Sequence, residues 1–515
     1  MASIEALEEN IERAKVKTAI GGKEFIPNDQ FKTLFTRQAV EHFCEIPDGL
    51  DINKVMKVVA TLISIGKLDS HTIQWLHEHE ADLTDDLLPV TYKQSNVTFK
   101  PSSEEKEELE VADFLPGSRH RGAFDNNQWL FLSPTFGGAK HLDLDQFCPL
   151  PIIHHRSHNL HGAQSKVYEV QIHYAHLSMD PPPTEHENPK LALKELTSSS
   201  DKDFHREQQA LQKIQRLRHP HLIELVASFK QGSEYFFLFP WAEHGHLRSV
   251  WESQMGAETR TPKFVRWAFE QMAGLAGGIA AMNKPDESLA KYENGRHGDL
   301  KPENILLFED KLNESWGTLR IADAGLARFH EQVTSKRVAG TTTYGSTIEY
   351  APPEARSTKD GIPKRSRRFD IWSLGCVYLE FTIWILGGFA EVETFRDSKK
   401  SPKSRRKQFY EESTSKGYKT HPKVKDYLSK LRSHERCGEN TCFRDLLEII
   451  RKHLLVVNVE KRMESSELCS RFGKILQQGT ERPEYWCGPG FEPQPFPPKS
   501  GPRNFLERIA SLSAS

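Results

Sequence analysis

Hydrophobic residues recur at helical spacing through the first ninety positions of the chain. Apolar positions return every three or four residues, which is the period of a helix with one buried face. The repeat is carried by Ile4, Leu7 and Ile11, by Phe31, Leu34 and Phe35, and by Val55, Met56, Val59, Leu62 and Ile63. This pattern predicts a small all-α region over residues 1–92, with a role in partner binding or regulation.

The pattern changes over residues 93–149. Residues 93–111 are polar and acidic and have little to bury, so they are predicted to form a linker. Residues 112–149 lead into the main domain, and their apolar run 128–132 (QWLFL) predicts a short strand.

Residues 150–478 mix short apolar runs with long helical repeats. The run 235–239 (YFFLF) has the length of a buried strand, and helical periodicity before and after it predicts an α+β domain. Residues 180–189 and 397–407 are predicted surface insertions, the second with six Lys or Arg. Residues 479–515 are rich in proline and predict an extended tail.

Composition narrows the classes of partner. The 515 residues carry 69 Lys and Arg against 71 Asp and Glu, a net charge of −2, so neither nucleic acid nor a membrane is an expected partner. The first residues are acidic where a secretory signal is basic and apolar. Seven scattered cysteines without a C-x-x-C pair fit reduced thiols. We therefore expect an intracellular protein, cytoplasmic or nuclear.

Residues 297–304 (HGDLKPEN) combine the groups that phosphoryl transfer needs. The reaction uses a carboxylate near the attacking hydroxyl, a cation near the phosphate, and oxygen ligands for Mg²⁺. Asp299, Lys301 and Asn304 supply these three types, and Asp323 follows nineteen residues after Asn304.

These residues resemble the motifs of the protein kinase family, H-R-D-L-K-x-x-N and D-F-G. The resemblance implies a two-lobed α+β kinase fold that binds ATP and Mg²⁺ and acts on a protein substrate. It implies that Asp299 is the catalytic base, that Lys301 lies beside the γ-phosphate, and that Asn304 and Asp323 bind the metal. Lysine at position 301 is the serine/threonine type of this loop.

The nucleotide-binding residues are assigned by the same resemblance. Residues 191–194 (LALK) resemble the V-A-I-K strand, so Lys194 is the phosphate-binding lysine and Glu207 its partner. The glycine-rich loop aligns with residues 160–167 (LHGAQSKV), which keep the middle glycine alone. The resemblance places nucleotide contacts at Gly162, Val167, Ala192, Lys194, Glu207, Phe239, Trp241, Ala242, Leu306 and Asp323.

Two further motifs lie downstream. Residues 350–354 (YAPPE) resemble the A-P-E motif. This motif ends the activation segment, which starts at Asp323. Arg462 matches the family's arginine that pairs with the glutamate of this motif, here Glu354. Residues 370–375 (DIWSLG) resemble the motif that begins the central helix of the large lobe. The nearly uncharged stretch 371–390, long enough for a membrane span, is therefore predicted to be a buried helix.

Three motifs depart from the family pattern: the glycine loop keeps one of its three glycines, Ala324 replaces phenylalanine, and Gly298 replaces arginine. In kinases with that arginine, a phosphate on the activation segment holds it in place. Glycine has no charge to neutralise, so we expect activity without phosphorylation of Thr341, Thr342 or Thr343. A kinase fold without activity, acting as a nucleotide-binding or scaffolding module, remains the alternative.

The remaining patterns carry less chemistry. The histidines before the glycine loop lack zinc-like spacing, and the basic run 399–407 is predicted to be a solvated insertion, with docking of acidic substrates or nuclear import as the alternative. Every residue with an assigned role lies after residue 160. A chain starting at about residue 112 is therefore predicted to fold and keep activity.

Overall fold

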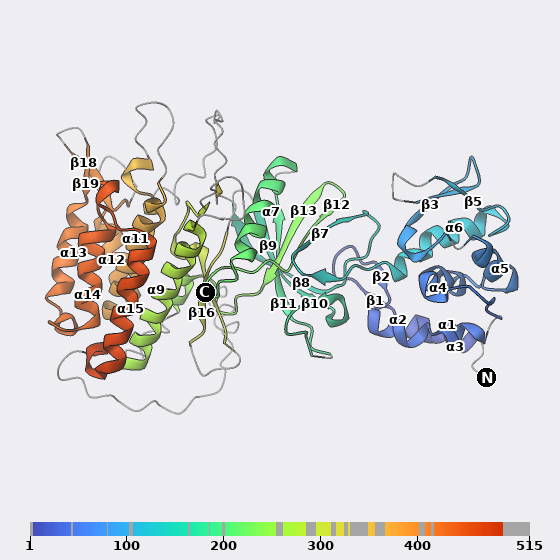
Figure 1. Cartoon of the computed structure of the whole chain (residues 1–515), viewed down its shortest axis with the longest axis horizontal. Coiled ribbons are helices and arrows are strands. Elements are labelled where there is room, and N and C mark those ends of the chain that lie inside the picture. The colour runs from blue at the N-terminus through green and yellow to red at the C-terminus, as the bar shows by residue number, and fades with distance from the viewer. Residues whose placement is uncertain are drawn as a thin grey trace, which may run out of the picture. The chain divides into compact units, whose positions relative to one another are not determined.

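The computed structural model of the chain divides into two compact units (Figure 1). The first unit comprises Met1–Arg218 and Ile223–Ala242, and the second comprises His219–Leu222 and Glu243–Ser515. The structure describes residues 4–42, 45–79, 81–101, 107–162, 165–184, 186–197, 201–253, 261–284, 295–310, 316–323, 328–329, 349–355, 366–400, 407–413 and 417–487.

Helices around one hydrophobic core form most of the N-terminal part of the first unit. The core extends along the chain from Leu7 to Phe131. A capping box fixes the start of one helix, because the Asp69 carboxylate accepts the Thr72 N–H while the Thr72 hydroxyl accepts the Asp69 N–H. The elements are α1 (Ile4–Ala14), α2 (Asn28–Leu34), α3 (Arg37–Glu41), η1 (Ile52–Lys54), α4 (Met56–Ser64), α5 (Ser70–Glu78), η2 (Asp85–Leu87), α6 (Ser118–Asn127) and η3 (Gln128–Phe131).

Strands also occur in this part, so it is mixed rather than all-α. A two-stranded and a three-stranded antiparallel sheet are formed by β1 (Val16–Lys17) and β2 (Glu24–Phe25), and by β3 (Val90–Lys93), β4 (Thr98–Pro101) and β5 (Leu109–Glu110). Strands β4 and β5 lie within the predicted linker 93–111. Phe99 is wholly buried there while Lys100 is exposed, the alternation of a half-buried strand. The predicted strand at 128–132 is wrong, because η3 occupies it.

A six-stranded sheet forms the rest of the first unit. Its order is β7-β12-β13-β11-β9-β8, and all neighbours are antiparallel except β7, which runs parallel to β12. In the central strand Leu191 and Leu193 are buried, the two-residue period of a strand. The elements are β6 (Phe136–Gly137), β7 (Lys140–Leu144), β8 (Ile152–Gly162), β9 (Ser165–Ile172), η4 (Tyr174–His176), β10 (Leu177–Ser178), β11 (Lys190–Leu196), α7 (Asp201–Arg216), β12 (Ala227–Gln231) and β13 (Glu234–Pro240).

Polar contacts join the two parts of the first unit. The Asn28 backbone N–H donates to Nε2 of His176 at 3.2 Å, and the Tyr174 hydroxyl donates to Asp29 at 2.5 Å. The Phe25 ring meets the His176 ring edge-on, with centroids 5.3 Å apart. The N-terminal part therefore contacts the lobe that carries the sheet directly.

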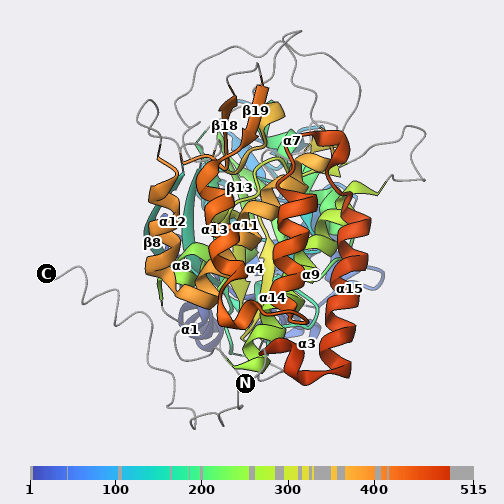
Figure 2. The ribbon, with the colours of Figure 1, turned by 90° about the vertical axis from the view of Figure 1, so that its left-hand side faces the viewer.

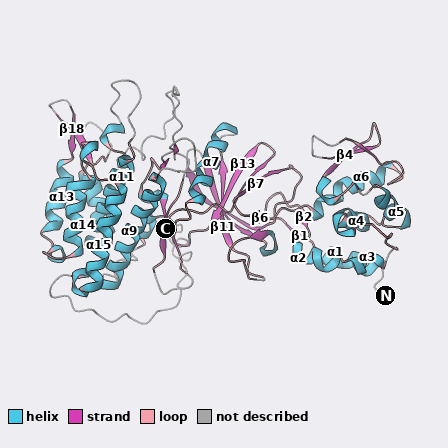
Figure 3. Cartoon of the chain, viewed as in Figure 1, coloured by secondary structure: helices cyan, strands magenta, loops and turns pink. Residues whose placement is uncertain are grey.

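Helices dominate the second unit, and its strands form short pairs (Figure 3). Helices α9 and α15 lie side by side (Figure 2). The helices are α8 (Leu247–Glu252), α9 (Pro262–Asn283), α11 (Arg368–Gly387), α12 (Phe389–Ser398), α13 (Pro422–Arg432), α14 (Cys442–Ile449) and α15 (Ser465–Glu481). Shorter helical turns are η5 (Pro302–Asn304), η7 (Pro353–Ala355), η8 (Glu435–Cys437), η9 (Ile450–Leu454), η10 (Val459–Lys461) and η11 (Pro483–Trp486), and the strands are β14 (Gly295–Arg296), β15 (Ile305–Phe308), β16 (Thr318–Ile321), β17 (Arg328–Phe329), β18 (Tyr410–Ser413) and β19 (Gly417–Thr420).

Helix α11 is the helix that the sequence predicts to be buried. Among the described residues it alone is long and apolar enough to cross a membrane, yet the whole of its apolar window is buried inside the protein. The prediction of a buried core helix is confirmed.

The predicted extended tail begins later than residue 479. Helix α15 continues to Glu481, and the Trp486 indole N–H then donates to the Gly479 carbonyl at 2.9 Å. A Cβ at position 479 would lie 2.0 Å from that indole, so the close approach requires glycine. The Tyr485 hydroxyl donates to Asp445 at 2.6 Å. Residues 488–515 lie outside the described part of the chain.

Candidate active site

An ion pair joins the central sheet of the first unit to its helix. Nζ of Lys194, on β11, lies 2.7 Å from Oε1 of Glu207, on α7, and both side chains are largely buried. Helix α7 is fixed against β13 because the Phe204 ring stacks on the rings of Tyr235 and Phe237. The pairing predicted between Lys194 and Glu207 is thus present.

Strand register places four of the predicted nucleotide-binding residues on one face of this sheet. Lys194 is directly opposite Val167 on β9, and Ala192 is directly opposite Phe239 on β13. Residues opposite each other and residues two apart share a face. Gly162 pairs with Ser165 at the end of the β8–β9 hairpin, and Ala163 and Gln164 lie outside the described residues.

The other predicted nucleotide contacts belong to different segments. Trp241 and Ala242 follow β13 at the end of the first unit. Leu306 lies on β15 of the second unit, where it is half-buried while its neighbours Ile305 and Leu307 are fully buried. The alternation turns the Leu306 side chain away from the core.

A buried carboxylate of α11 anchors the loop 297–304. Asp370 accepts the backbone N–H groups of His297 at 2.9 Å and Gly298 at 2.8 Å. Gly298 has φ +79°, a conformation that glycine adopts without a Cβ penalty. The His297 ring makes a further hydrogen bond, at 2.9 Å, with the Ala322 carbonyl. The loop conformation is therefore set by the core helix and by the strand end that precedes Asp323.

Three predicted catalytic residues form one hydrogen-bonded set within this loop. Lys301 Nζ lies 2.9 Å from Oδ2 of Asp299, and the Asn304 amide donates to the Asp299 carbonyl at 2.8 Å and to Oδ2 at 3.2 Å. Burial raises the pKa of the Asp299 carboxyl above its usual range, and the nearby Asp323 charge adds to the rise, while Lys301 and His297 oppose it. The set presents a carboxylate poised to take up a proton.

Asn304 and Asp323 are held close by the backbone between them. The Ala322 N–H donates to the Asn304 carbonyl at 2.9 Å, and Asp323 follows with an exposed side chain and φ +63°. Both hydrogen bonds described for the Asn304 side chain are donated by its amide nitrogen. The amide oxygen of Asn304, Oδ1, is therefore left to bind a cation. An amide oxygen beside a carboxylate is a donor set that suits Mg²⁺.

A second predicted ion pair lies deeper in the unit. The wholly buried Arg462 guanidinium donates to both carboxylate oxygens of Glu354, at 2.7 and 3.0 Å. It also donates to the carbonyls of Arg368 and Val456, and its guanidinium carbon lies 5.2 Å from the centre of the Trp372 ring. The predicted pairing of Glu354 with Arg462 is confirmed.

Much of the activation segment lies outside the described residues. Ala324, Thr341, Thr342 and Thr343 belong to that part, so the expectations placed on them stay predictions. Residues 401–406 of the basic run are also outside it.

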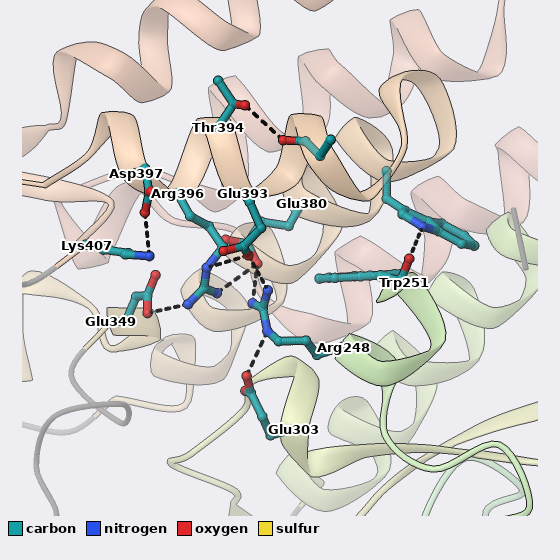
Figure 4. Close-up of polar contacts among 12 residues, drawn as sticks. Arg248, Trp251, Glu303, Glu349, Glu380, Glu393, Thr394, Arg396, Asp397 and Lys407 are labelled. Atoms are coloured by element: carbon teal, nitrogen blue, oxygen red, sulfur yellow. Dashed lines mark hydrogen bonds and ion pairs between the residues drawn. The ribbon is translucent and has the colours of Figure 1, made fainter. Parts of the chain in front are cut away.

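A buried charged cluster was not predicted from the sequence (Figure 4). The prediction of a solvated basic run is wrong for Lys399, which is fully buried and 3.7 Å from Glu380 of α11. Arg248 and Arg396 lie near the same carboxylate, at 3.4 and 3.8 Å. Isolated charged residues give no periodic signal, because only tertiary packing buries them.

Comparison with known proteins identifies the family. Residues 184–471, more than half of the chain, match the protein kinase domain. Over about 37% of its length the chain is 28% identical to "Probable L-type lectin-domain containing receptor kinase VI.1" of Arabidopsis thaliana and 26% identical to "Cyclin-dependent kinase-like 4" of Mus musculus. It is 26% identical over 36% of its length to "Serine/threonine-protein kinase Nek1" of Mus musculus.

These alignments cover 25%, 48% and 14% of the three relatives, so the chain spans less than half the length of each. The match to the domain includes strand β11 with Lys194 in the first unit and the loop with Asp299 in the second. The chain therefore belongs to the protein kinase family.

Proposed function

We propose that this protein is a serine/threonine kinase that transfers the γ-phosphoryl group of ATP to a hydroxyl of a protein substrate. The observation that carries the proposal is the hydrogen-bonded set of Asp299, Lys301 and Asn304. One loop thereby supplies a base, a cation and an amide oxygen, the groups that phosphoryl transfer uses. Lysine at position 301 favours serine or threonine as the acceptor.

Each side chain has a separate task in the proposed reaction. The substrate hydroxyl oxygen bonds to the γ-phosphorus while the bond from that phosphorus to the bridging oxygen of ADP breaks, and Asp299 takes up the hydroxyl proton. The Lys301 ammonium offsets negative charge on the transferred group. Lys194, oriented by Glu207 at 2.7 Å, binds the phosphates that remain on ADP.

Asn304 and Asp323 would hold Mg²⁺ through oxygen atoms. When bound, the metal neutralises charge on the phosphate oxygens. Burial and the Asp323 charge both raise the pKa of Asp299, so a cation at Asp323 would favour the ionised base.

The alternative is a nucleotide-binding or scaffolding module without turnover. It is favoured by the glycine loop, which keeps Gly162 alone and so brings more side chains near the phosphates. The complete set of Lys194, Asp299, Asn304 and Asp323 favours catalysis, since scaffolding has no chemical use for it.

Phosphate incorporation decides between the two functions. The full chain is incubated with γ-labelled ATP, Mg²⁺ and a generic basic protein, beside Asp299→Asn. We expect incorporation by the wild type and its loss in the variant, with nucleotide-induced thermal stabilisation kept in both, because the base meets the hydroxyl and not the nucleotide. Equal incorporation by both proteins would refute the assignment of Asp299. Thermal stabilisation without incorporation by the wild type would support the scaffold.

A further inference from the structure

A cluster of charged side chains lies in the second unit outside the set around Asp299 (Figure 4). Its members come from the loop after Lys301, the end of the activation segment, α8, α11 and the region of α12. The carboxylates are Glu303, Glu349, Glu380 and Glu393, and the cations are Arg248, Arg396 and Lys399. Most of these charges are largely buried, so each depends on partners within the cluster.

Arg248, on α8, joins three of these segments. Its Nε donates to Glu303 at 2.9 Å and one terminal nitrogen donates to Glu393 at 3.1 Å. The other terminal nitrogen donates to the Tyr350 hydroxyl at 2.8 Å. The Arg248 side chain is 11% exposed, and its guanidinium carbon lies 5.6 Å from the centre of the Trp251 ring. One restrained guanidinium thus links the residue before Asn304 to the end of the activation segment.

Tyr350 uses its whole hydrogen-bonding capacity in the cluster. Its hydroxyl oxygen accepts from Arg248 and, at 2.7 Å, from Arg396, and it donates to Glu380 at 2.8 Å. A phenol has one donor and two lone pairs. Burial raises its pKa well above the usual range, so the donor stays protonated. Arg396 also donates to Glu349 at 3.1 Å, which holds the neighbouring residue as well.

The cluster rests on the core helix. Glu380, wholly buried on α11, has the ammonium of Lys399 3.7 Å from its second oxygen. Lys399 is itself wholly buried, 3.2 Å from the centre of the Phe409 ring and 4.4 Å from that of Phe395. Helix α11 also carries Asp370, which binds residues 297 and 298 at the start of the loop 297–304. Through Glu380 and Arg248 the same helix is linked to Glu303 near the end of that loop.

We propose that Arg248 and Arg396 are positioning residues that hold the catalytic loop and the end of the activation segment in their working arrangement on α11. The proposal rests on the proposed kinase function. In kinases with arginine beside the catalytic aspartate, a phosphate on the activation segment provides this order. Here Gly298 offers no charge to a phosphate, and two arginines order residues 349–350 and Glu303 instead.

Kinetics on the full chain test the catalytic part of the proposal. Arg248→Met removes the link to Glu303 and Tyr350, and we expect kcat to fall about 10- to 100-fold, since small displacements of catalytic groups have effects of this size. The KM for ATP should change less than about threefold, because Arg248 lies outside the nucleotide-binding residues. Arg248→Lys keeps the positive charge but loses the branched guanidinium, so its kcat should lie between those of the wild type and Arg248→Met. The matched control is Arg266→Met on α9, whose pair with Glu270 is exposed.

Tyr350→Phe covers the case in which Arg248→Met does not fold. It removes the one oxygen that hydrogen-bonds to Arg248, Arg396 and Glu380, with little change of shape. Its kcat should fall by a factor similar to that for Arg248→Met. The double variant Arg248→Met/Tyr350→Phe should have a kcat little lower than either single variant, as expected for residues that act as one unit. Full activity of either single variant with a normal melting temperature would overturn the proposal.

Hydrogen exchange provides a readout that does not need turnover. In Arg248→Met, backbone amides of residues 299–304 and 349–355 should both exchange faster than in the wild type, and Arg266→Met should leave them unchanged. Faster exchange in one segment alone would refute the coupling. If the wild type transfers no phosphate but both segments respond, the proposed function fails while the coupling through Arg248 stands. Phosphatase treatment of the wild type should leave exchange and kcat unchanged, and a loss of either would show that a phosphate provides the order.

Discussion

Replacing Arg462 with alanine should destabilise the second unit strongly. The guanidinium is wholly buried and donates to both oxygens of Glu354 and to the carbonyls of Arg368 and Val456. Alanine removes all four interactions and leaves the acceptors in place. Cavity formation below the Trp372 ring adds to the loss.

The magnitude follows from what is left unpaired. Removing one partner of a buried ion pair costs about 3–5 kcal/mol, because the remaining charge has no compensation. The Glu354 side chain is 16% exposed, so water reaches part of the carboxylate and the lower end of that range, about 3 kcal/mol, is expected. For a domain of this size, about 2–4 °C per kcal/mol gives a fall in melting temperature of roughly 6–12 °C.

Thermal unfolding of the full chain, followed by circular dichroism, measures this change. The matched control is Arg471→Ala, because Arg471 forms an exposed pair with Glu467 on α15, at 3.1 Å. Such surface pairs contribute about 0.2–1 kcal/mol. A fall for Arg462→Ala no larger than for Arg471→Ala would refute the reasoning and would mean that hydration compensates Glu354.

Three other changes test separate parts of the structure. Lys194→Met leaves Glu207 without its cation and should weaken ATP binding about 10- to 100-fold by calorimetry, the loss of a charge-assisted contact of about 1.5–3 kcal/mol. Gly298→Ala places a Cβ at φ +79° and should lower the unfolding free energy in urea by about 1–2 kcal/mol; an unchanged midpoint would show that the loop relaxes. Burial lowers the pKa of His176 from 6.5 to about 4, so the unfolded chain binds the proton first. The contribution of His176 to the stability of the first unit should therefore be full above pH 6.5 and fall by about 3 kcal/mol as the pH drops towards 4. The difference in unfolding free energy between the wild type and His176→Gln measures this contribution, because buried Asp85, whose pKa is raised to about 6, has the opposite pH dependence in both proteins.

The residues that could be predicted from the sequence belong to motifs whose residue types and order are required by phosphoryl-transfer chemistry. The pairs Lys194–Glu207 and Glu354–Arg462 were expected from the sequence, and both are present. Their residue types, order and spacing are fixed by the shared chemistry of the family. Helix α11 was predictable because a long apolar stretch that starts at Asp370 must be buried on all sides.

Charged residues buried by tertiary packing were not predictable. Lys399 stands next to Lys400 in the sequence, yet Lys399 is fully buried and Lys400 is exposed beside Asp397. Composition and periodicity assign both to the surface. The difference arises because the aromatic rings of Phe395 and Phe409 cover Lys399, and no local pattern specifies that contact.

The N-terminal boundary was also hidden, and here the structure changes an expectation. The sequence predicts that a chain starting at residue 112 folds and keeps activity, since every catalytic motif follows this residue. In the structure the cut removes Trp75, whose ring centre lies 4.4 Å from that of Phe114, and Phe99, whose ring centre lies 5.2 Å from that of Phe124. Phe114 and Phe124, which remain after the cut, are fully buried in the same core. Exposing each of them costs about 1.5–3 kcal/mol of hydrophobic stabilisation.

Together with the other apolar side chains of this core, the loss is comparable with the whole stability of a domain, about 5–15 kcal/mol. The cut also removes Asn28 and Asp29, which bind His176 and Tyr174 beside the sheet. We therefore expect a chain starting at residue 112 to aggregate or to melt well below the full protein, as measured by size-exclusion chromatography and differential scanning fluorimetry. A monomeric product that melts like the full chain and keeps its activity would restore the sequence prediction, because the sheet lobe would then be stable without the N-terminal core.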